Sequence, residues 1–368
     1  MIDLSSPSNL LAKDWIDTIR TEAVGAEKHA RLTKKQLNLI YDQGWFKILI
    51  PSAYGGKQLT LPEVIAIEEA LAYADGSLGW VVTLCAGAGW FGGFMESSLA
   101  ANLLSGDHVC LAGSGALKGT AEITAGGYLI NGKWPYASGT PEASSFTANC
   151  IVTESGKPVK EENGNDKDIA VVLLKNEVVV TEEWNSFGMR ATGSHAYEVK
   201  DLNINTDRAF DITQAPVVQS PLYYFPFHQL AEATLAVNMT GMAVHFMELC
   251  GKMLDEKNNT DNTGAVNREA LNDKYNMLLQ KLNVARQKLF YAVDMSWQVC
   301  MANKEISPSL LYKISAASFT AVHVVRDCVN TLFPYCGLKA ADKDSEINRV
   351  WRDIHTAGQH AMLAGDGN

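Results

Sequence analysis

The sequence predicts an α+β protein whose helical and strand-forming segments are segregated along the chain. Residues 1–107 and 214–368 place apolar side chains at helical spacing, whereas residues 108–213 alternate with a period of two. Segregation of this kind favours helices packed beside one sheet over repeated βαβ units. We therefore expect an N-terminal helical domain (1–107), a central antiparallel β-domain (108–213) and a C-terminal four-helix bundle (214–368).

Four helices are expected in the first domain. The first spans residues 10–26, and the second spans 34–43 between an N-cap at Thr33 and a terminating glycine at Gly44. Pro62 suits the start of the third, which runs to residue 74, because a first-turn residue needs no N–H donor. Residues 78–95 are long and uncharged enough for a membrane span, but their five glycines and lack of basic flanks predict a buried helix.

The β-domain is expected to contain seven short strands, with Gly126-Gly127 as a hairpin turn and residues 155–168 as a solvated loop. The strands are predicted at residues 108–114, 121–124, 128–136, 146–153, 170–174, 178–182 and 196–204. Helical spacing then returns, and it predicts four long helices at residues 227–254, 267–301, 308–335 and 345–363, with a break at 258–264.

Composition narrows the functional classes. The 368 residues are 47% hydrophobic and 20% charged, with a net charge of −10 and no Lys/Arg run, which argues against nucleic-acid or anionic-membrane partners. The first residues lack the basic and apolar regions of an export signal. Seven scattered cysteines without a C-x-x-C pair predict buried thiols in a reducing cytoplasm and no metal centre.

Four motifs could carry chemistry. Residues 134–139 (WPYASG) end a predicted strand, residues 112–121 are glycine-rich without forming a dinucleotide-binding motif, and residues 188–194 (GMRATGS) combine small and hydroxyl side chains. The last of these could bind a phosphate or simply form a tight turn between strands. On the final predicted helix, His360 has a pKa near working pH and could serve as a general base.

Together these motifs resemble the acyl-CoA dehydrogenase superfamily, and most closely its branch of monooxygenases that use reduced flavin. The resemblance extends over nearly the whole chain and implies that superfamily's fold. It implies that Ser138 hydrogen-bonds the flavin or its oxygen adduct, that Trp134 packs near the ring, and that Ser114, Thr192 and Ser194 contact the cofactor. His360 stands where dehydrogenases commonly carry a catalytic glutamate and where monooxygenases place a histidine facing the flavin.

The resemblance therefore implies the oxygenase component of a two-component monooxygenase. Such an enzyme takes reduced FMN or FAD from a separate flavin reductase, reacts it with O2 and oxidises a small-molecule substrate. A cytoplasmic homotetramer is the assembly that the family implies. His360 and Ser138 are the expected catalytic residues.

Two alternatives stay open. An FAD-dependent acyl-CoA dehydrogenase would use Glu232, a carboxylate within the apolar run of residues 230–237, as its base. A non-catalytic flavin- or acyl-binding scaffold is suggested by departures from the family pattern: Leu117 replaces a proline, Ala88 a histidine, and Lys252-Met253 part of an FAD-binding segment.

Overall fold

The structure is a computed structural model that describes residues 6–260, 265–302 and 304–364. Its N-terminal part contains α1 (Lys13–His29), α2 (Lys34–Gln43), α3 (Leu61–Ala74), α4 (Gly76–Trp90) and α5 (Ser97–Leu104). The predicted ends of α2 are confirmed, because the Thr33 hydroxyl accepts from the Gln36 N–H and Gly44 adopts the left-handed conformation. The uncharged segment forms the buried α4 followed by a 3₁₀ turn at Phe91–Gly93. Within the described residues, no helix combines the length and apolar character that crossing a bilayer requires.

The central region is one twisted sheet with the order β6-β7-β2-β1-β3-β5-β8, and β4 pairs with β3. Its strands are β1 (Leu111–Thr124), β2 (Gly127–Ala137), β3 (Ser145–Glu154), β4 (Lys157–Pro158), β5 (Asp168–Leu174), β6 (Val179–Thr181), β7 (His195–Asn205) and β8 (Ala209–Phe210). The expectation of a wholly antiparallel sheet was wrong in one respect, since β1 and β3 are parallel. The chain leaves β2 through a short turn (Thr140–Glu142) and enters β3 on the other side of β1, in the same direction.

The C-terminal part follows a short α6 (Pro221–Tyr224) and is built from α7 (Phe227–Thr260), α8 (Ala265–Met301), α9 (Pro308–Cys336) and α11 (Glu346–Ala357), with a short α10 (Leu338–Ala341) before the last. The four long helices confirm the predicted bundle. The predicted break at 258–264 lies partly outside the described residues, and α7 extends to Thr260.

The last predicted helix is wrong as a single element. Helix α11 ends at Ala357, residues 358–360 form a turn, and α12 (Ala361–Ala364) begins after His360. The Gly358 N–H bonds the Ile354 carbonyl, which completes the last turn of α11 and redirects the chain.

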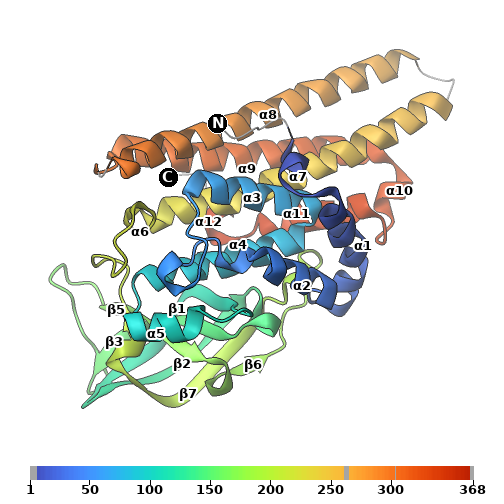
Figure 1. Ribbon diagram of the computed structural model, residues 1–368. Coiled ribbons are helices and arrows are strands. Elements are labelled where there is room, and N and C mark those ends of the chain that lie inside the picture. Colours follow the sequence, from blue (N-terminus) through green and yellow to red (C-terminus); the bar gives the residue numbers. More distant parts are fainter. Residues whose placement is uncertain (1–5, 261–264, 303, 365–368) are drawn as a thin grey trace.

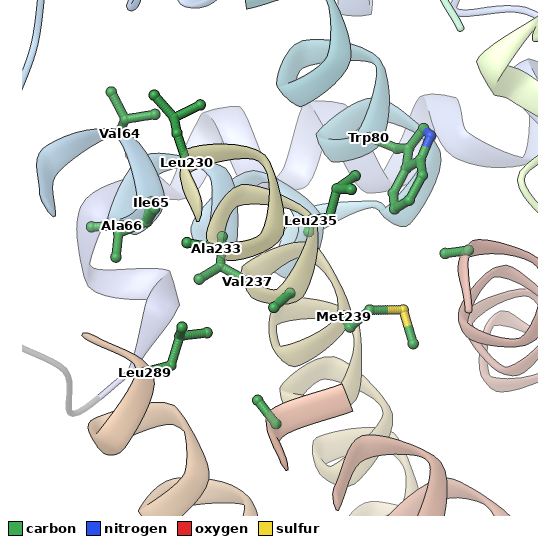
Figure 2. Close-up of a cluster of buried hydrophobic side chains, with 14 of the residues drawn as sticks. Val64, Ile65, Ala66, Trp80, Leu230, Ala233, Leu235, Val237, Met239 and Leu289 are labelled. Atoms are coloured by element: carbon green, nitrogen blue, oxygen red, sulfur yellow. The ribbon is translucent and has the colours of Figure 1, made fainter. Parts of the chain in front are cut away.

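Helices α3 and α4 join the sheet to the bundle, as Figure 1 shows with the sheet at one end of the molecule and α8 at the other. The core between α3, α7 and α8 is apolar and buried. In Figure 2, Leu230, Ala233 and Val237 of α7 lie beside side chains of α3 and near Leu289 of α8, while Leu235 points toward Trp80 of α4. This packing fixes α4 and α7 as one wall of the site described below.

Candidate active site

A cavity of about 300 Å³ lies between the sheet and the helices. Its wall on the sheet side comes from β1, β3, β5 and β8, and its helical wall comes from α4 and α7, with the turn before α12 closing one side. Most of the lining is apolar, with aromatic rings from Phe91, Phe210 and Phe227. A largely apolar pocket with a few polar groups is typical of a small-molecule site, and this volume is at the small end of the usual range.

Glycines keep two walls of the cavity open. A side chain at Gly87 on α4 or at Gly115 on β1 would meet no atom within 4 Å. By contrast, a Cβ at Gly113 would lie 2.3 Å from the Thr147 hydroxyl oxygen, so the close approach of β1 to β3 requires glycine there. Flat, side-chain-free walls suit a planar ligand.

His360 lines the cavity and contacts the edge of the Trp80 ring, with 5.7 Å between ring centroids. Burial lowers the pKa of His360 below its ordinary value, which favours the neutral imidazole near pH 7. Its Nδ1 accepts a hydrogen bond from the Met362 N–H at 3.3 Å and thereby caps α12. In this arrangement the proton of the neutral ring is on Nε2, which is the nitrogen available to a ligand.

Ser114 also lines the cavity, at a point where the pairing of β1 with β3 shifts register. Its hydroxyl oxygen accepts from the Ala116 N–H at 3.4 Å. Leu117, which departs from the family pattern, follows in the same bulge and is 45% exposed. Ala88 stands on the cavity wall itself, so the missing histidine leaves that part of the cavity apolar.

Ser138, Ser194 and Thr192 form one buried hydroxyl chain, although none of them lines the cavity. The Ser138 and Ser194 oxygens are 2.8 Å apart, and the Ser194 and Thr192 oxygens are 2.6 Å apart. Thr192 donates its hydrogen to the Met189 carbonyl at 2.8 Å, so Ser194 must donate to Thr192 and Ser138 to Ser194. The chain therefore ends on a Ser138 oxygen that keeps its lone pairs for an external donor.

The hydroxyl chain adjoins the cavity through α4. The Cys85 thiol of α4 contacts the Ser138 carbonyl oxygen at 3.7 Å, while Leu84 and Gly87 of the same helix line the cavity. Adjacent faces of one helix thus touch the two predicted groups, His360 with the cavity on one side and the hydroxyl chain on the other.

Trp134 lies away from the cavity, which differs from the expectation of a flavin contact. Its side chain is fully buried in the core of the sheet, stacks on Tyr197 at 5.4 Å and donates its indole N–H to the Asn149 carbonyl. The exposed ring of this motif belongs instead to Tyr136, which is 73% exposed and has a left-handed φ of 63°. The irregularity at Tyr136 breaks the alternation of β2, so strand periodicity could not have identified the outward-facing aromatic.

Glu232, the base of the dehydrogenase alternative, faces away from the cavity. One carboxyl oxygen accepts from the Ser315 hydroxyl of α9 at 2.5 Å, and the other lies 3.1 Å from Nε2 of His228. The cavity does include Asp168 and Asp211 at its sheet side. Burial acts to raise the pKa of Asp211, but hydrogen bonds from Thr213 and Gln214 outweigh it and lower that pKa, so Asp211 is a weak base.

The loop at 188–194 is a tight turn anchored to α11. A Cβ at Gly188 would lie 2.1 Å from the Arg352 carbonyl, which only glycine avoids, and Met189 and Gly193 both have positive φ. The Met189 N–H donates to the Asp353 carboxylate at 2.5 Å. This anchoring supports the turn interpretation of the motif, and cofactor binding by Thr192 and Ser194 stays a prediction.

The sequence analysis missed a buried polar cluster beside the cavity, formed by Glu68, Thr83 and Asn238. Thr83 lines the cavity, and its hydroxyl accepts from the Asn238 amide at 2.6 Å. The available signal was a pair of glutamates, at 68 and 69, within the otherwise apolar α3. All seven cysteines are buried, as predicted.

The carboxy-terminal residues 233–364 match the family described as acyl-CoA dehydrogenase, C-terminal domain. Oxygenase subunit HsaA of a flavin-dependent monooxygenase from Mycobacterium tuberculosis is 26% identical, over 97% of this chain and 91% of its own. Indole-3-acetate monooxygenase from Acinetobacter baumannii is 23% identical, over 87% of this chain and 81% of its own.

Solved structures show the same fold. The HsaA crystal structure from M. tuberculosis superposes with a TM-score of 0.86 at 23% identity, covering 98% of this chain and 94% of that one. XiaF from Streptomyces, solved with FADH2 and glycerol, gives 0.85 at 20% identity, covering 98% and 94%. The chain therefore belongs to the acyl-CoA dehydrogenase superfamily, and the relatives that it matches along most of their length are flavin-dependent monooxygenases.

Proposed function

We propose that this protein is the oxygenase component of a two-component monooxygenase that uses reduced flavin and O2. The observation that carries the proposal is the composition of the cavity wall, where His360 stands and Glu232 does not. A dehydrogenase needs a carboxylate base directed at its substrate, whereas a neutral imidazole suits proton management on a hydroxylated or aminated ring. The relatives named as flavin-dependent monooxygenases support the same conclusion.

The described residues fit a flavin. Ser138, Ser194, Thr192 and Ser114 would hold it, beside the exposed ring of Tyr136, which has little cover within the chain. When bound, reduced flavin supplies the electrons that activate O2. The free lone pairs on Ser138 suit the N–H that only the reduced ring carries at its central nitrogen, so we expect preference for the reduced state. FMN and FAD both stay candidates.

The roles of the chain's own residues follow from their placement. His360 would orient the substrate and hold or accept its proton, and the aromatic lining of the cavity would keep water from the reacting atoms. The cavity volume and lining favour a compact, mainly apolar substrate. A separate reductase is the proposed source of reduced flavin, and a cytoplasmic homotetramer is the proposed assembly.

The deciding experiment is an anaerobic titration of the protein with oxidised and with photoreduced FMN and FAD. We expect clearly tighter binding of the reduced form and a colourless protein as purified. The matched variant Ser138→Ala should lose most of this preference, because it removes the acceptor. A yellow protein that reduces its bound FAD with a saturated acyl-CoA would instead establish the dehydrogenase.

A further inference from the structure

Glu68 of α3 is a carboxyl group without exposed surface, and neither of its oxygens has a hydrogen-bond partner among the described residues. An ionised carboxylate in such surroundings is strongly disfavoured, so the group keeps its proton. Accordingly, burial raises the pKa of Glu68 to about 8. The Asn238 carbonyl oxygen beside this cluster also has no partner in the described part of the chain.

Thr83 connects this buried acid to the cavity. It is the side chain whose hydrogen-bonding capacity opposes the effect of burial on the Glu68 pKa, and its own residue lines the cavity from α4. A threonine hydroxyl has one hydrogen to donate and two lone pairs. The Asn238 amide occupies one lone pair at 2.6 Å, which leaves one lone pair and the hydrogen to be shared between Glu68 and the cavity.

We propose that Glu68 sets the hydrogen-bond polarity of Thr83 toward the ligand, so that the cavity recognises a compact aromatic compound bearing a hydrogen-bond acceptor such as a carbonyl oxygen. Protonated Glu68 donates to the remaining lone pair of Thr83, and the Thr83 hydrogen is then directed at the ligand. Ionised Glu68 draws that hydrogen to itself, and Thr83 offers the ligand a lone pair. No covalent bond forms or breaks in this exchange. The substrate class rests on the proposed function, whereas the polarity of Thr83 does not.

The charged groups on the surrounding helices are paired elsewhere. On α3, Glu69 is bound by Arg286 of α8 at 2.8 Å and by the Thr240 hydroxyl of α7 at 2.6 Å. At the start of α4, Asp75 lies near Arg349, and none of these groups acts on the Glu68 pKa. On the cavity wall, His360 and Asp211 have lowered pKa values and do not titrate near pH 8.

Calorimetric binding of two matched probes without flavin tests the proposal. 1-Indanone carries a carbonyl acceptor, indane is the same bicycle without one, and neither titrates between pH 6 and 9.5. At pH 6 we expect 1-indanone to bind about tenfold more tightly than indane, the contribution of one hydrogen bond. This advantage should fall away as the pH rises through about 8. Equal binding of the two probes at pH 6, or binding of neither, would overturn the proposal.

Three variants separate the switch from a purely structural role. Thr83→Val should abolish the advantage at all pH values, while Thr234→Val should keep it, because the Thr234 hydroxyl lines the same cavity but donates to the Ala231 carbonyl. Glu68→Gln should keep the advantage and remove its pH dependence, since the amide donates to Thr83 at every pH. Retention of the wild-type pH dependence in Glu68→Gln would refute the assignment.

An infrared titration provides a readout that needs neither ligand nor turnover. Wild type should show a protonated-carboxyl band that disappears near pH 8 and is missing from Glu68→Gln. Asp353, whose pKa burial also raises to about 8, titrates in the same window, so the difference between the two proteins isolates Glu68. If the switch is confirmed but reduced flavin does not bind, the proposed function fails and the inference about Thr83 stands.

Discussion

His360 reaches the cavity from a turn, and this placement determines which of its nitrogens can act. Its Nδ1 is held by the Met362 N–H at the start of α12, so the ring orientation depends on the cap. Taking a proton from a substrate at Nε2 would require the ring to place its own proton on Nδ1 and release that cap. Catalysis and local helix stability are therefore coupled in one side chain.

At the residue scale, His360→Asn and His360→Ala should differ in stability but not in activity. Both remove the imidazole and should lower product formation by about 10²–10⁴, the usual contribution of a general base. Asparagine can still cap α12 through its side-chain oxygen, so its melting temperature should stay near wild type while that of the alanine variant falls. Product formation with photoreduced flavin and calorimetric melting provide the two measurements.

Glu232→Gln is the matched control for this prediction. Glutamine can still accept from Ser315, and we expect near-normal activity because Glu232 faces α9. An inactive Glu232→Gln beside a fully active His360→Ala would contradict the assignment of His360.

At the scale of elements, α11 and the loop at 188–194 are held together by one buried acid. Asp353 of α11 accepts from the Met189 N–H, and it shares Arg349 with Asp75 at the start of α4. Burial, with a smaller contribution from the Asp75 charge, raises the pKa of Asp353 to about 8. Three elements that border the site thus meet at a carboxyl that prefers to be protonated.

This arrangement predicts a pH dependence of stability. The unfolded chain releases the Asp353 proton near pH 3.8 and the folded chain near pH 8, so the folded state binds more protons between these values. The contribution of Asp353 to stability is therefore greatest below about pH 4 and declines as the pH rises to 8, by at most about 1.4 kcal/mol per pH unit.

Asp353→Asn should remove this decline, because an amide keeps the acceptor for Met189 and cannot ionise. Its melting temperature should rise relative to wild type between pH 5.5 and pH 8.5. A difference between the two proteins that is the same at both pH values would show that Asp353 does not titrate as described.

At the scale of the whole molecule, exposed apolar side chains gather on the outer face of the bundle. Met277, Val284 and Tyr291 of α8 are spaced by seven residues and lie on one face of that helix, and Tyr312 of α9 is exposed on the same groove as Tyr291. Figure 1 places α8 at the edge of the molecule farthest from the sheet. Such a stripe supports the proposed tetramer, with bundles packed against one another.

We expect the double variant Val284→Glu/Tyr291→Glu to lower the oligomeric state, because each charge would be buried in the proposed interface. Val24→Glu on α1, another exposed valine outside this stripe, is the control and should leave the mass unchanged. Light scattering coupled to size-exclusion chromatography measures both. An unchanged mass for the double variant would place any subunit interface elsewhere.

The sequence by itself determined the helical and strand-forming regions, the cap at Thr33, the buried character of residues 78–95, and the importance of His360 and the hydroxyl residues. These follow from periodicity, local caps and motif resemblance, which act over a few residues and can be read along the chain. Tertiary structure alone decided that α11 stops before His360, that β3 runs parallel to β1, and that Tyr136 and not Trp134 faces outward. It also brought Glu68, Thr83 and Asn238 together from three helices, because contacts between residues distant in sequence depend on how whole elements pack.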